Sequence, residues 1–385
     1  MFINMDINKK NYENILTNEE IERYKRHITL EELGIQGQVK LKNSSVIFIG
    51  AGGLGSSAIL YIAAAGIGKI GIIDNDQVEE SNLQRQIIHT TSEIGQNKTD
   101  SAEKKIKLLN PNCLVSIFTE RLTSKNILKI INEFDIVCDC SDNFGTKYLL
   151  NDACVILKKP FIYGSVQGFT GQISVFNLET NSPNLRDLIP KSPQREDIPS
   201  CSEFGVIGVS PGLIGILQAN EIIKIIIKKG QMLDGKVLVF NLLDNCIKTL
   251  NLKANPENKN ILDFAKYIED YEDETVENIN KIKTISYLKF KEIYKKNTNK
   301  ILLIDVREES EYNKSSIDGS LSLPLTKIKN NINLDFLKQN YFGKQIYIIC
   351  QKGVRSEKAV RLFMKRKINA ISIEGGLDKL KELVK

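Results

Sequence analysis

The residues best suited to chemistry begin with a glycine turn and an acid that follows it. The β-branched run Val46 to Ile49 leads into Gly50-Ala51-Gly52-Gly53-Leu54-Gly55, and a second apolar run, Ile70 to Ile73, ends at Asp74. Glycines at this spacing bring backbone N–H groups close to a phosphate at a helix N-terminus. An acid about twenty residues further on can hold a ribose hydroxyl. The pattern predicts a nucleotide site, with these residues in it: Gly50, Gly52, Gly53, Gly55 and Asp74.

Polar residues after Asp74 indicate which nucleotide is bound. Asp76, Asn82, Arg85 and Lys98 follow on the expected loop side of the sheet. A dehydrogenase needs little charge beyond its ribose-binding acid, whereas a triphosphate that loses pyrophosphate needs cations. The cluster therefore favours ATP. An NAD-dependent oxidoreductase is the enzyme alternative, and the Arg85/Lys98 pair and the lack of a hydride-site His or Tyr constellation argue against it.

A further acid is expected at the same edge of the sheet. Phe134 to Cys140 has the pattern of a buried parallel strand, and it leads into Ser141-Asp142-Asn143. Open α/β sheets bind ligands at the carboxyl ends of their strands, so Asp142 is a candidate Mg²⁺ ligand. The competing interpretation is that Asp142 caps the following helix.

A second chemical centre lies near the C-terminus. The apolar run from Gln345 to Ile349 is followed directly by Cys350-Gln351-Lys352-Gly353-Val354-Arg355-Ser356, and a helix is predicted from Ser356. A cysteine between a strand and a helix N-terminus meets converging N–H groups that stabilise a thiolate, a persulfide or a bound oxyanion. A phosphatase-like anion cradle fits the same residue types.

Composition limits the class of protein. The 385 residues carry a net charge of +6 and no basic stripe interleaved with aromatic residues, so no nucleic-acid partner is expected. The seven cysteines are an odd number without framework spacing, which favours a reducing compartment. No secretory signal is evident. Val46 to Gly68 is long enough to cross a bilayer, but its glycine turn makes a buried strand and helix the better interpretation, and no membrane partner is expected.

The pattern of elements predicts an α/β protein with a Rossmann-like nucleotide domain and a small second α/β domain. We expect the first domain over residues 1–253, an acidic linker over 254–281 and the second domain over 282–385. Thr17-Asn18-Glu19-Glu20 is a capping-box pattern, and we expect it to open a helix that runs to about Gly34.

These motifs resemble two known families. The first 250 or so residues resemble the ubiquitin-activating-type adenylyltransferases (the ThiF/MoeB/HesA family), and the last hundred resemble a rhodanese domain. The combination resembles the molybdopterin-synthase adenylyltransferase/sulfurtransferases. The motifs that carry the resemblance are Arg23-Tyr24-x-Arg26-x-Ile28, the Gly50–Gly55 turn, Asp74-x-Asp76, Ser81-Asn82-Leu83-Gln84-Arg85-Gln86, Gly95-x-x-Lys98 and Asp142-Asn143.

The resemblance implies roles for several residues of the chain. Asp74 would hold the ATP ribose with Asp76 beside it, and Asn82, Arg85 and Lys98 would hold the phosphates. Asp142 would position Mg²⁺. Arg26 would reach the triphosphate of the other subunit, so that a homodimer is the catalytic unit. Cys201 matches a mobile-loop cysteine, and Cys350 matches the cysteine that carries the persulfide.

The chain also departs from the family pattern. Two Cys-x-x-Cys pairs that bind structural zinc in the family would fall at Asn184 and Asp187 and at Asn258 and Ile261, so we expect no structural zinc. The Gly-His-Ile that is usual in the rhodanese domain is replaced by Ser315-Ser316-Ile317.

The function implied is ATP-dependent adenylation of the C-terminal Gly-Gly of a small ubiquitin-like sulfur-carrier protein, followed by transfer of sulfur from a persulfide donor. The molybdopterin-synthase small subunit is the expected carrier, and a thiamine-pathway or tRNA-thiolation carrier is the alternative. A non-catalytic scaffold is disfavoured because Arg85, Lys98, Asp142 and Cys350 are all present. The expected location is the cytoplasm, or the chloroplast stroma if the gene belongs to an AT-rich plastid genome.

Overall fold

The computed structural model describes residues 16–191, 205–271, 283–297, 300–329, 341, 343–365 and 368–383. The chain divides into two compact units, Met1–Asp273 and Glu274–Lys385. This division falls inside the range predicted as a linker. Part of that range belongs to the first unit, because Ile261 is buried and both Phe264 and Tyr271 pack against its core.

An eight-stranded mixed sheet forms the centre of the first unit, in the order β3-β2-β1-β4-β5-β6-β7-β8. Its parallel strands are β1 (Ser45–Ile49), β2 (Lys69–Ile73), β3 (Leu114–Phe118), β4 (Ile136–Asp139) and β5 (Phe161–Gln167), and its antiparallel strands are β6 (Thr170–Phe176), β7 (Lys236–Asn241) and β8 (Cys246–Asn251).

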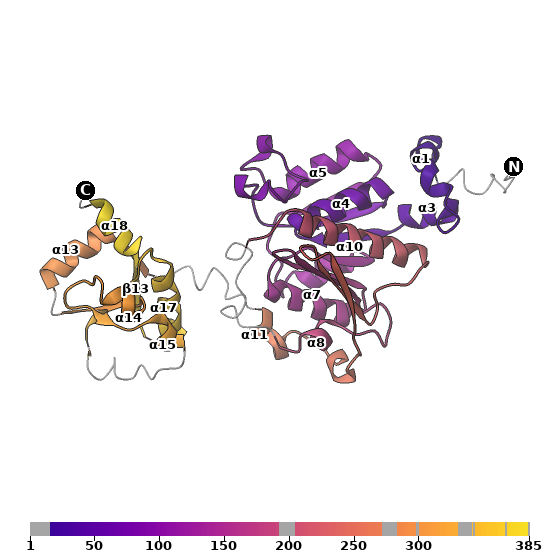
Figure 1. Ribbon diagram of the computed structural model, residues 1–385. Helices are drawn as coiled ribbons and strands as arrows, with labels where there is room; N and C mark the ends of the chain where they lie inside the picture. Colours follow the sequence, from indigo (N-terminus) through magenta and orange to yellow (C-terminus); the bar gives the residue numbers. More distant parts are fainter. Residues whose placement is uncertain are drawn as a thin grey trace. The chain divides into compact units, whose positions relative to one another are not determined.

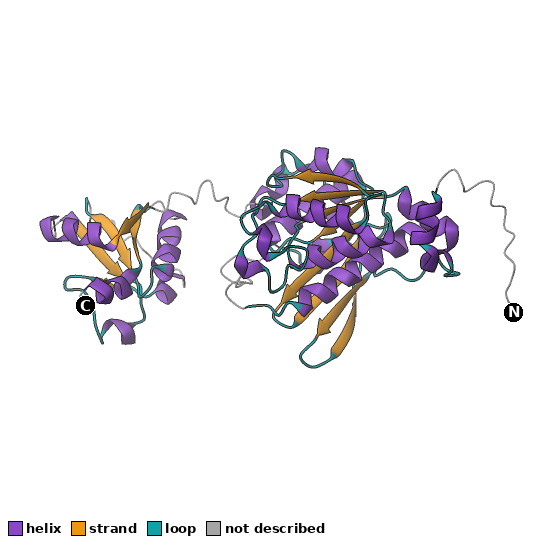
Figure 2. Cartoon of the chain, turned by 90° about the horizontal axis from the view of Figure 1, so that it is seen from above, coloured by secondary structure: helices purple, strands orange, loops and turns teal. Residues whose placement is uncertain are grey.

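Helices cover both faces of this sheet (Figures 1 and 2). They are α1 (Asn18–Arg23), α2 (Lys25–Ile28), α3 (Gly34–Lys42), α4 (Gly53–Ala65), α5 (Lys98–Leu109), α6 (Ile127–Asn132), α7 (Phe144–Leu157), α8 (Leu185–Leu188), α10 (Val209–Ile227) and α11 (Ile268–Tyr271). Strand β1 shows why two layers form. Val46 and Phe48 join the core under α4 and α10, while Ile47 and Ile49 join the core under α6 and α7.

The helix predicted from Thr17 to Gly34 is only partly present. The capping box forms, since Thr17 accepts a hydrogen bond from the backbone of Glu20 and the Glu20 side chain accepts one in return. The helix ends at Arg23, however, and α2 ends at Ile28. Gly34 has a φ of +60° and begins α3 instead of ending a helix. A left-handed residue at that position turns the chain, which a continuous helix would not allow.

Helix α10 is long and apolar enough to cross a membrane by length and composition alone. It lies against α4 and the sheet, and Ile214, Ala219 and Ile222 are part of the core. Half of its apolar stretch is buried inside the protein, as in a core helix of a folded domain.

The second unit has a parallel five-stranded sheet in the order β11-β10-β12-β13-β9. Its elements are β9 (Lys283–Ser286), α13 (Tyr287–Asn297), β10 (Ile301–Asp305), α14 (Glu309–Tyr312), β11 (Leu321–Ser322), α15 (Leu325–Lys329), β12 (Gln345–Ile349), α17 (Val354–Lys365), β13 (Ala370–Glu374) and α18 (Gly376–Leu383). Two apolar clusters lie on opposite faces of this sheet. The predicted α/β class, with a Rossmann-like sheet and a small second α/β unit, is confirmed.

Candidate functional site

Strand register brings the predicted nucleotide residues to one edge of the first sheet. Ile49 at the end of β1 pairs with Ile73 on one side and with Asp139 on the other. Because the strands are parallel, the chain leaves all three at the same edge. The glycine turn, the loop after Asp74 and the loop that holds Asp142 are therefore neighbours.

Two glycines of the turn are required by close backbone contacts. Gly50 has a φ of +104°, and a Cβ on it would lie 2.8 Å from the carbonyl oxygen of Cys140. A Cβ on Gly55 would lie 2.3 Å from the carbonyl oxygen of Gly50. Gly52 is the N-cap of α4 and offers no side-chain cap. The first N–H groups of α4 are thus available to an anion.

Asp74 supports this turn from the end of β2. Its carboxylate accepts hydrogen bonds from the N–H of Ala51 at 2.8 Å and from the N–H of Asp76 at 2.9 Å. Burial raises the pKa of Asp74, and the nearby charge of Lys98 opposes that rise. The acid predicted to hold a ribose therefore also fixes the conformation of the glycine turn.

Lys98, at the first position of α5, forms an ion pair with Asp76. Nζ lies 2.8 Å from Oδ2, and the side chain of Lys98 is 7% exposed while that of Asp76 is 62% exposed. A pair with so exposed a partner contributes little free energy, so a phosphate can compete for the lysine.

Asn82 and Arg85 lie on the loop between β2 and α5. Asn82 is buried and accepts a hydrogen bond from the N–H of Glu79 at 3.2 Å. Arg85 donates from a guanidinium nitrogen to the Ser81 carbonyl at 2.9 Å. A Cβ on Gly53 would lie 3.7 Å from Cγ of Arg85, which places the arginine at the N-terminus of α4.

The question of whether Asp142 or its neighbour caps α7 is answered by the hydrogen bonds. Asn143 is the N-cap, and its side chain accepts from the N–H of Thr146 at 2.8 Å. Asp142 is exposed, and no hydrogen bond to its carboxylate is found in the described part of the chain. An exposed carboxylate at the edge of the sheet suits Mg²⁺, which binds one or two carboxylates together with substrate phosphates.

A buried ion pair behind Asp142 was not anticipated from the sequence. Lys147 donates to Asp139 at 2.7 Å, to the Ser141 carbonyl at 2.9 Å and to the Gly164 carbonyl at 2.8 Å. Burial is the largest single influence and acts to lower the pKa of Lys147, but the charges of Asp139 and Tyr163 and the hydrogen bond to Asp139 together outweigh it, so the pKa is raised. The pair holds the loop that presents Asp142. An aspartate inside an otherwise apolar strand was the signal in the sequence.

His89 and Gln86 were also missed. His89 is buried and contacts the carbonyl oxygen of Ala51 in the glycine turn with Nε2, at 2.9 Å. Gln86 is 4% exposed, and its carbonyl oxygen is buried without a hydrogen-bond partner in the described structure. Their signal was weak: one of only two histidines in the chain, and a glutamine beside a predicted phosphate ligand.

Arg26 is not near the glycine turn of its own chain. Tyr24 is anchored at the opposite end of α4, because Asn110 donates to both the Tyr24 hydroxyl at 2.7 Å and the Ala63 carbonyl at 2.8 Å. Arg26 is exposed on α2 beside this anchor. The 13 residues of α4 span about 20 Å, whereas an arginine side chain spans about 7 Å. Cys201, the cysteine predicted to take part in the chemistry of the first unit, lies outside the described residues.

Cys350 lies in a cradle of donors after β12. Its sulfur accepts from the N–H of Gly353 at 3.1 Å and from the N–H of Ser356 at 3.3 Å, and the thiol donates to the Ser356 hydroxyl oxygen at 3.6 Å. Gly353 has a φ of +95°, a conformation that lets the loop curl around the sulfur. Donors aimed at one sulfur stabilise its anionic forms.

Two arginine pairs brace this cradle. The Arg355 guanidinium binds both oxygens of Glu311, at 2.6 and 2.8 Å, and holds the pKa of Glu311 down to about 2. Arg307 is buried against Asp305 at 2.7 Å and also donates to Gln351 of the cysteine loop at 3.3 Å. It reaches the Ser315 carbonyl as well, within the segment that departs from the family pattern.

Three of the four positions where the resemblance would place zinc ligands are brought together in space. Asn184 donates to the Asn258 carbonyl at 2.9 Å, and Asp187 accepts from the Asn258 side chain at 2.8 Å. Ile261 is buried nearby in sequence. Within the described residues, no group of three or more His, Cys, Asp or Glu side chains could hold a metal ion.

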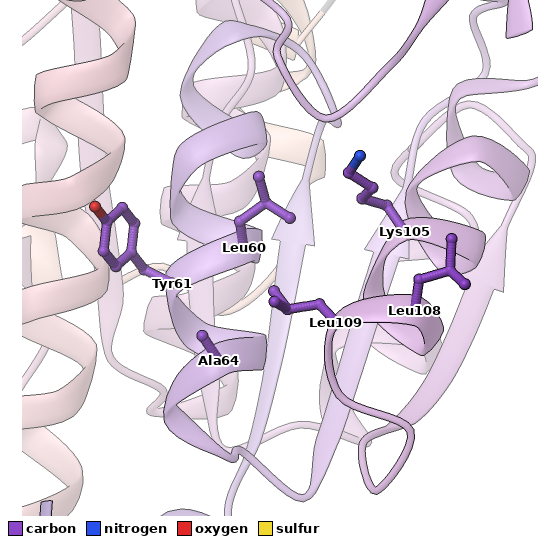
Figure 3. A pocket seen from close by; sticks show the side chains of 6 residues that line it. All are labelled: Leu60, Tyr61, Ala64, Lys105, Leu108 and Leu109. Carbon is purple, nitrogen blue, oxygen red and sulfur yellow. The ribbon is translucent and has the colours of Figure 1, made fainter. Parts of the chain in front are cut away.

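An apolar hollow of about 470 Å³ lies between α4 and α5, away from the glycine turn (Figure 3). Its lining residues are Leu60, Tyr61, Ala64, Lys105, Leu108 and Leu109. Tyr61 is 55% exposed and Leu108 is 76% exposed. A hollow lined mainly by aliphatic side chains does not suit a triphosphate, so it is a surface feature separate from the nucleotide site.

Comparison with known proteins gives a consistent result. Residues 24–261 match the ThiF family, and residues 289–383 match the rhodanese-like domain. The chain is 39% identical to a "Probable molybdopterin-synthase adenylyltransferase" from Pyropia yezoensis, with 95% of each chain covered. It is 36% identical to an "Adenylyltransferase and sulfurtransferase MOCS3" from Drosophila virilis, over 94% of this chain and 83% of that protein.

Solved structures are similar in fold. The E. coli MccB structure with ATP superposes with a TM-score of 0.54 at 24% identity, and the match covers 61% of this chain and 72% of that one. At this level of identity the likeness concerns the fold alone.

Proposed function

The chain belongs to the ThiF family and also carries a rhodanese-like domain, and from this premise we propose that it adenylates the C-terminal Gly-Gly of a small ubiquitin-like sulfur-carrier protein and then transfers sulfur to it. The enzyme is an adenylyltransferase with sulfurtransferase activity. One observation carries the proposal: the residues expected to bind ATP lie at one edge of the first sheet, namely the glycine turn, Asp74, Arg85, Lys98 and Asp142. The same chain holds Cys350 in a cradle of donors.

The first step requires charge neutralisation and alignment. A carboxylate oxygen of the carrier attacks the α-phosphorus of ATP, pyrophosphate leaves, and an acyl-adenylate forms. Arg85 and Lys98 would neutralise the phosphates, and Asp74 would hold the ribose. Asp142 would hold Mg²⁺, which neutralises charge on the departing pyrophosphate. No general base is needed, because the attacking carboxylate is already ionised at neutral pH.

The second step uses the cysteine cradle. The Cys350 thiolate attacks the outer sulfur of a persulfide donor, the donor's thiolate leaves, and Cys350 becomes a persulfide. The terminal sulfur of that persulfide attacks the acyl carbon of the adenylate, and AMP leaves. A thiol must then attack the Cys350 sulfur and break the S–S bond, which releases the carrier thiocarboxylate and leaves Cys350 in a disulfide with that thiol. We propose that Cys201 forms a covalent intermediate during this transfer.

We propose that the catalytic unit is a homodimer. The anchor at Tyr24 and Asn110 keeps Arg26 about the length of α4 away from its own glycine turn, and this supports a role for Arg26 at the site of a second copy. Arg23 on α1 donates to the Leu109 carbonyl at the end of the apolar hollow. The hollow and the segment that carries Arg26 thus form one continuous surface, which a second copy would cover.

For the carrier we propose the molybdopterin-synthase small subunit, in molybdenum cofactor biosynthesis. A thiamine-pathway or tRNA-thiolation carrier would offer the same Gly-Gly terminus, and a comparison of kcat/KM for purified carriers separates them. The cysteines in the described chain are free, as expected for a reducing compartment. We propose the cytoplasm, or the stroma of a plastid with an AT-rich genome.

The test of the proposed function is carrier-dependent exchange of labelled pyrophosphate into ATP. The wild-type protein should catalyse the exchange, and Arg85→Ala and Asp142→Ala should each lower it by about 100-fold or more, because each removes a charge at the phosphates. Lys107→Ala is the matched control, since this lysine pairs with Glu103 on the surface of α5 and should leave exchange unchanged. Wild-type exchange in both site variants would rule out the nucleotide site.

A further inference from the structure

Side chains contact both backbone polar groups of Ala51, its N–H and its carbonyl oxygen. Its N–H donates to the Asp74 carboxylate at 2.8 Å, and its carbonyl oxygen lies 2.9 Å from Nε2 of His89. We propose that His89 is a positioning residue for the adenylation reaction: it orients the peptide between Ala51 and Gly52 so that the Gly52 N–H faces the nucleotide phosphates. This inference rests on the proposed function, because it concerns how the same site binds ATP.

The geometry of a trans peptide supplies the first argument. The C=O of Ala51 and the N–H of Gly52 belong to one planar unit and point in opposite directions. While His89 holds that C=O, the Gly52 N–H must point away from the histidine. In the described structure the Gly52 N–H has no hydrogen-bond partner, and Gly52 is the N-cap of α4. It is therefore a free donor at a helix N-terminus, where anions bind.

The histidine is itself fixed. Its Nδ1 lies 2.7 Å from the hydroxyl of Ser101, a fully buried residue of α5, and that hydroxyl lies 2.9 Å from the buried carboxylate of Glu93. A carbonyl oxygen only accepts, so Nε2 carries a proton whichever way the Ser101 hydroxyl points. The bond from His89 to Ala51 is thus the same in the neutral and in the charged ring.

Gln86 independently indicates that a ligand binds beside the Gly52 N–H. Its Oε1 atom is buried and unpartnered among the described residues, and its Nε2 atom lies 3.7 Å from the place where a Cβ on Gly52 would be. Buried polar groups in proteins are almost always satisfied. A free amide beside a free N–H indicates that both await partners from a bound molecule or its water.

The experiment compares two amide substitutions at the same position. The amide nitrogen of glutamine can reach the place of Nε2, whereas that of asparagine reaches only the place of Nδ1. His89→Gln should keep the bond to Ala51, and His89→Asn should lose it while keeping a polar contact with Ser101. The full-length variants are titrated with Mg²⁺ and ATP by calorimetry, and the KM values for ATP and for the carrier are measured by pyrophosphate exchange.

We expect His89→Asn to weaken ATP binding by about 10-fold, the usual worth of one hydrogen bond, and to leave the KM for the carrier unchanged. His89→Gln should stay within about twofold of the wild type. If His89→Asn does not fold, Ser101→Ala takes its place, because it frees the ring without removing it and should weaken ATP binding by about threefold.

Equal ATP affinity in the asparagine and glutamine variants would overturn the inference, and so would a shared fall in Tm with no change in ATP affinity. If the wild type binds ATP but does not exchange pyrophosphate, the proposed function fails while the calorimetric comparison still decides the role of His89. A wild type that does not bind ATP overturns both.

Discussion

The side chain of Asn258 donates to the Asp187 carboxylate at 2.8 Å and joins segments 71 residues apart in the chain. The same carboxylate accepts from the N–H groups of Asn184 and Asn255, each at 2.8 Å. These contacts link α8 to the segment that follows β8. They form where the family resemblance would place two pairs of zinc-binding thiols, and we propose that the hydrogen bonds of this one aspartate take the place of a metal ion.

The first prediction from this cluster is that the purified protein carries no stoichiometric zinc. Of the four positions only Asp187 carries a zinc-binding side chain, because asparagine amides and an isoleucine are not the ligands of a structural zinc site, which needs four. Plasma mass spectrometry should find well under one zinc per chain, and a strong chelator should leave Tm unchanged. One tightly bound zinc per chain, or a chelator-dependent fall in Tm, would contradict the prediction.

The second prediction concerns Arg26 and the dimer. Arg26→Ala and Asp142→Ala should each be inactive in pyrophosphate exchange as homodimers. A heterodimer of the two, purified by a different tag on each subunit, should recover about half of the wild-type rate, because one of its two sites is then intact.

The heterodimer experiment separates action across subunits from action within one. If Arg26 served its own chain, both sites of the heterodimer would be defective and no activity would return. Arg23→Ala is the matched control, because this neighbouring arginine binds the Leu109 carbonyl and is given no part in the site. That variant should remain active when paired with the wild type.

The third prediction separates the two chemical steps. Cys350→Ala should eliminate sulfur transfer from thiosulfate or a persulfide donor and leave adenylation of the carrier near normal, because the cradle around Cys350 belongs to the second unit. Cys201→Ala should retain adenylation and impair thiocarboxylate formation to the extent that a covalent intermediate is used. Mass spectrometry of the carrier C-terminus distinguishes adenylate from thiocarboxylate.

Cys246→Ala serves as the control for loss of a thiol, since Cys246 is a free cysteine at a partly exposed position of β8. Thiocarboxylate formed at the wild-type rate by Cys350→Ala, with a persulfide donor, would mean that the rhodanese-like domain is not the sulfur relay. The loop would then have to be an anion-binding site.

The fourth prediction is a pH dependence of stability that comes from His89. Burial lowers the pKa of His89 below its usual value of 6.5, so the unfolded chain binds a proton more readily than the folded one. The stability that the folded chain has while His89 is neutral is fully present above pH 6.5, and it is lost as the pH falls through the folded pKa. The free energy of unfolding, measured with urea, should therefore fall between pH 7.5 and pH 5.5 by more in the wild type than in His89→Gln.

A wild type and a His89→Gln variant with the same slope between these two pH values would show that His89 titrates alike in the folded and unfolded chains. Carboxylates outside this network, such as Glu311 of the second unit, whose pKa is lowered by Arg355, also lose stabilising contacts in acid. They are present in both proteins, so their effect cancels in the comparison.

Much of the nucleotide site follows from the sequence by itself. Glycine spacing after a β-branched run specifies a strand, a turn and a helix N-terminus, because only glycine tolerates the φ of Gly50 and the backbone contact at Gly55. An acid at the end of the next strand and a cysteine at the end of β12 are likewise local patterns. Strand order then places the glycine turn and Asp74 at one edge of the first sheet, since parallel strands all end on the same side.

Only the tertiary structure decided the long-range pairings. Ala51 and His89, Asp139 and Lys147, and Asp187 and Asn258 are hydrogen-bonded partners whose separations follow no helical or strand period. The structure also assigned the helix cap to Asn143, which leaves Asp142 free. Such contacts depend on how helices and loops pack over the sheet, and packing is set by the whole core. A short sequence window therefore predicts the backbone of the site but not the side chains that hold it in place.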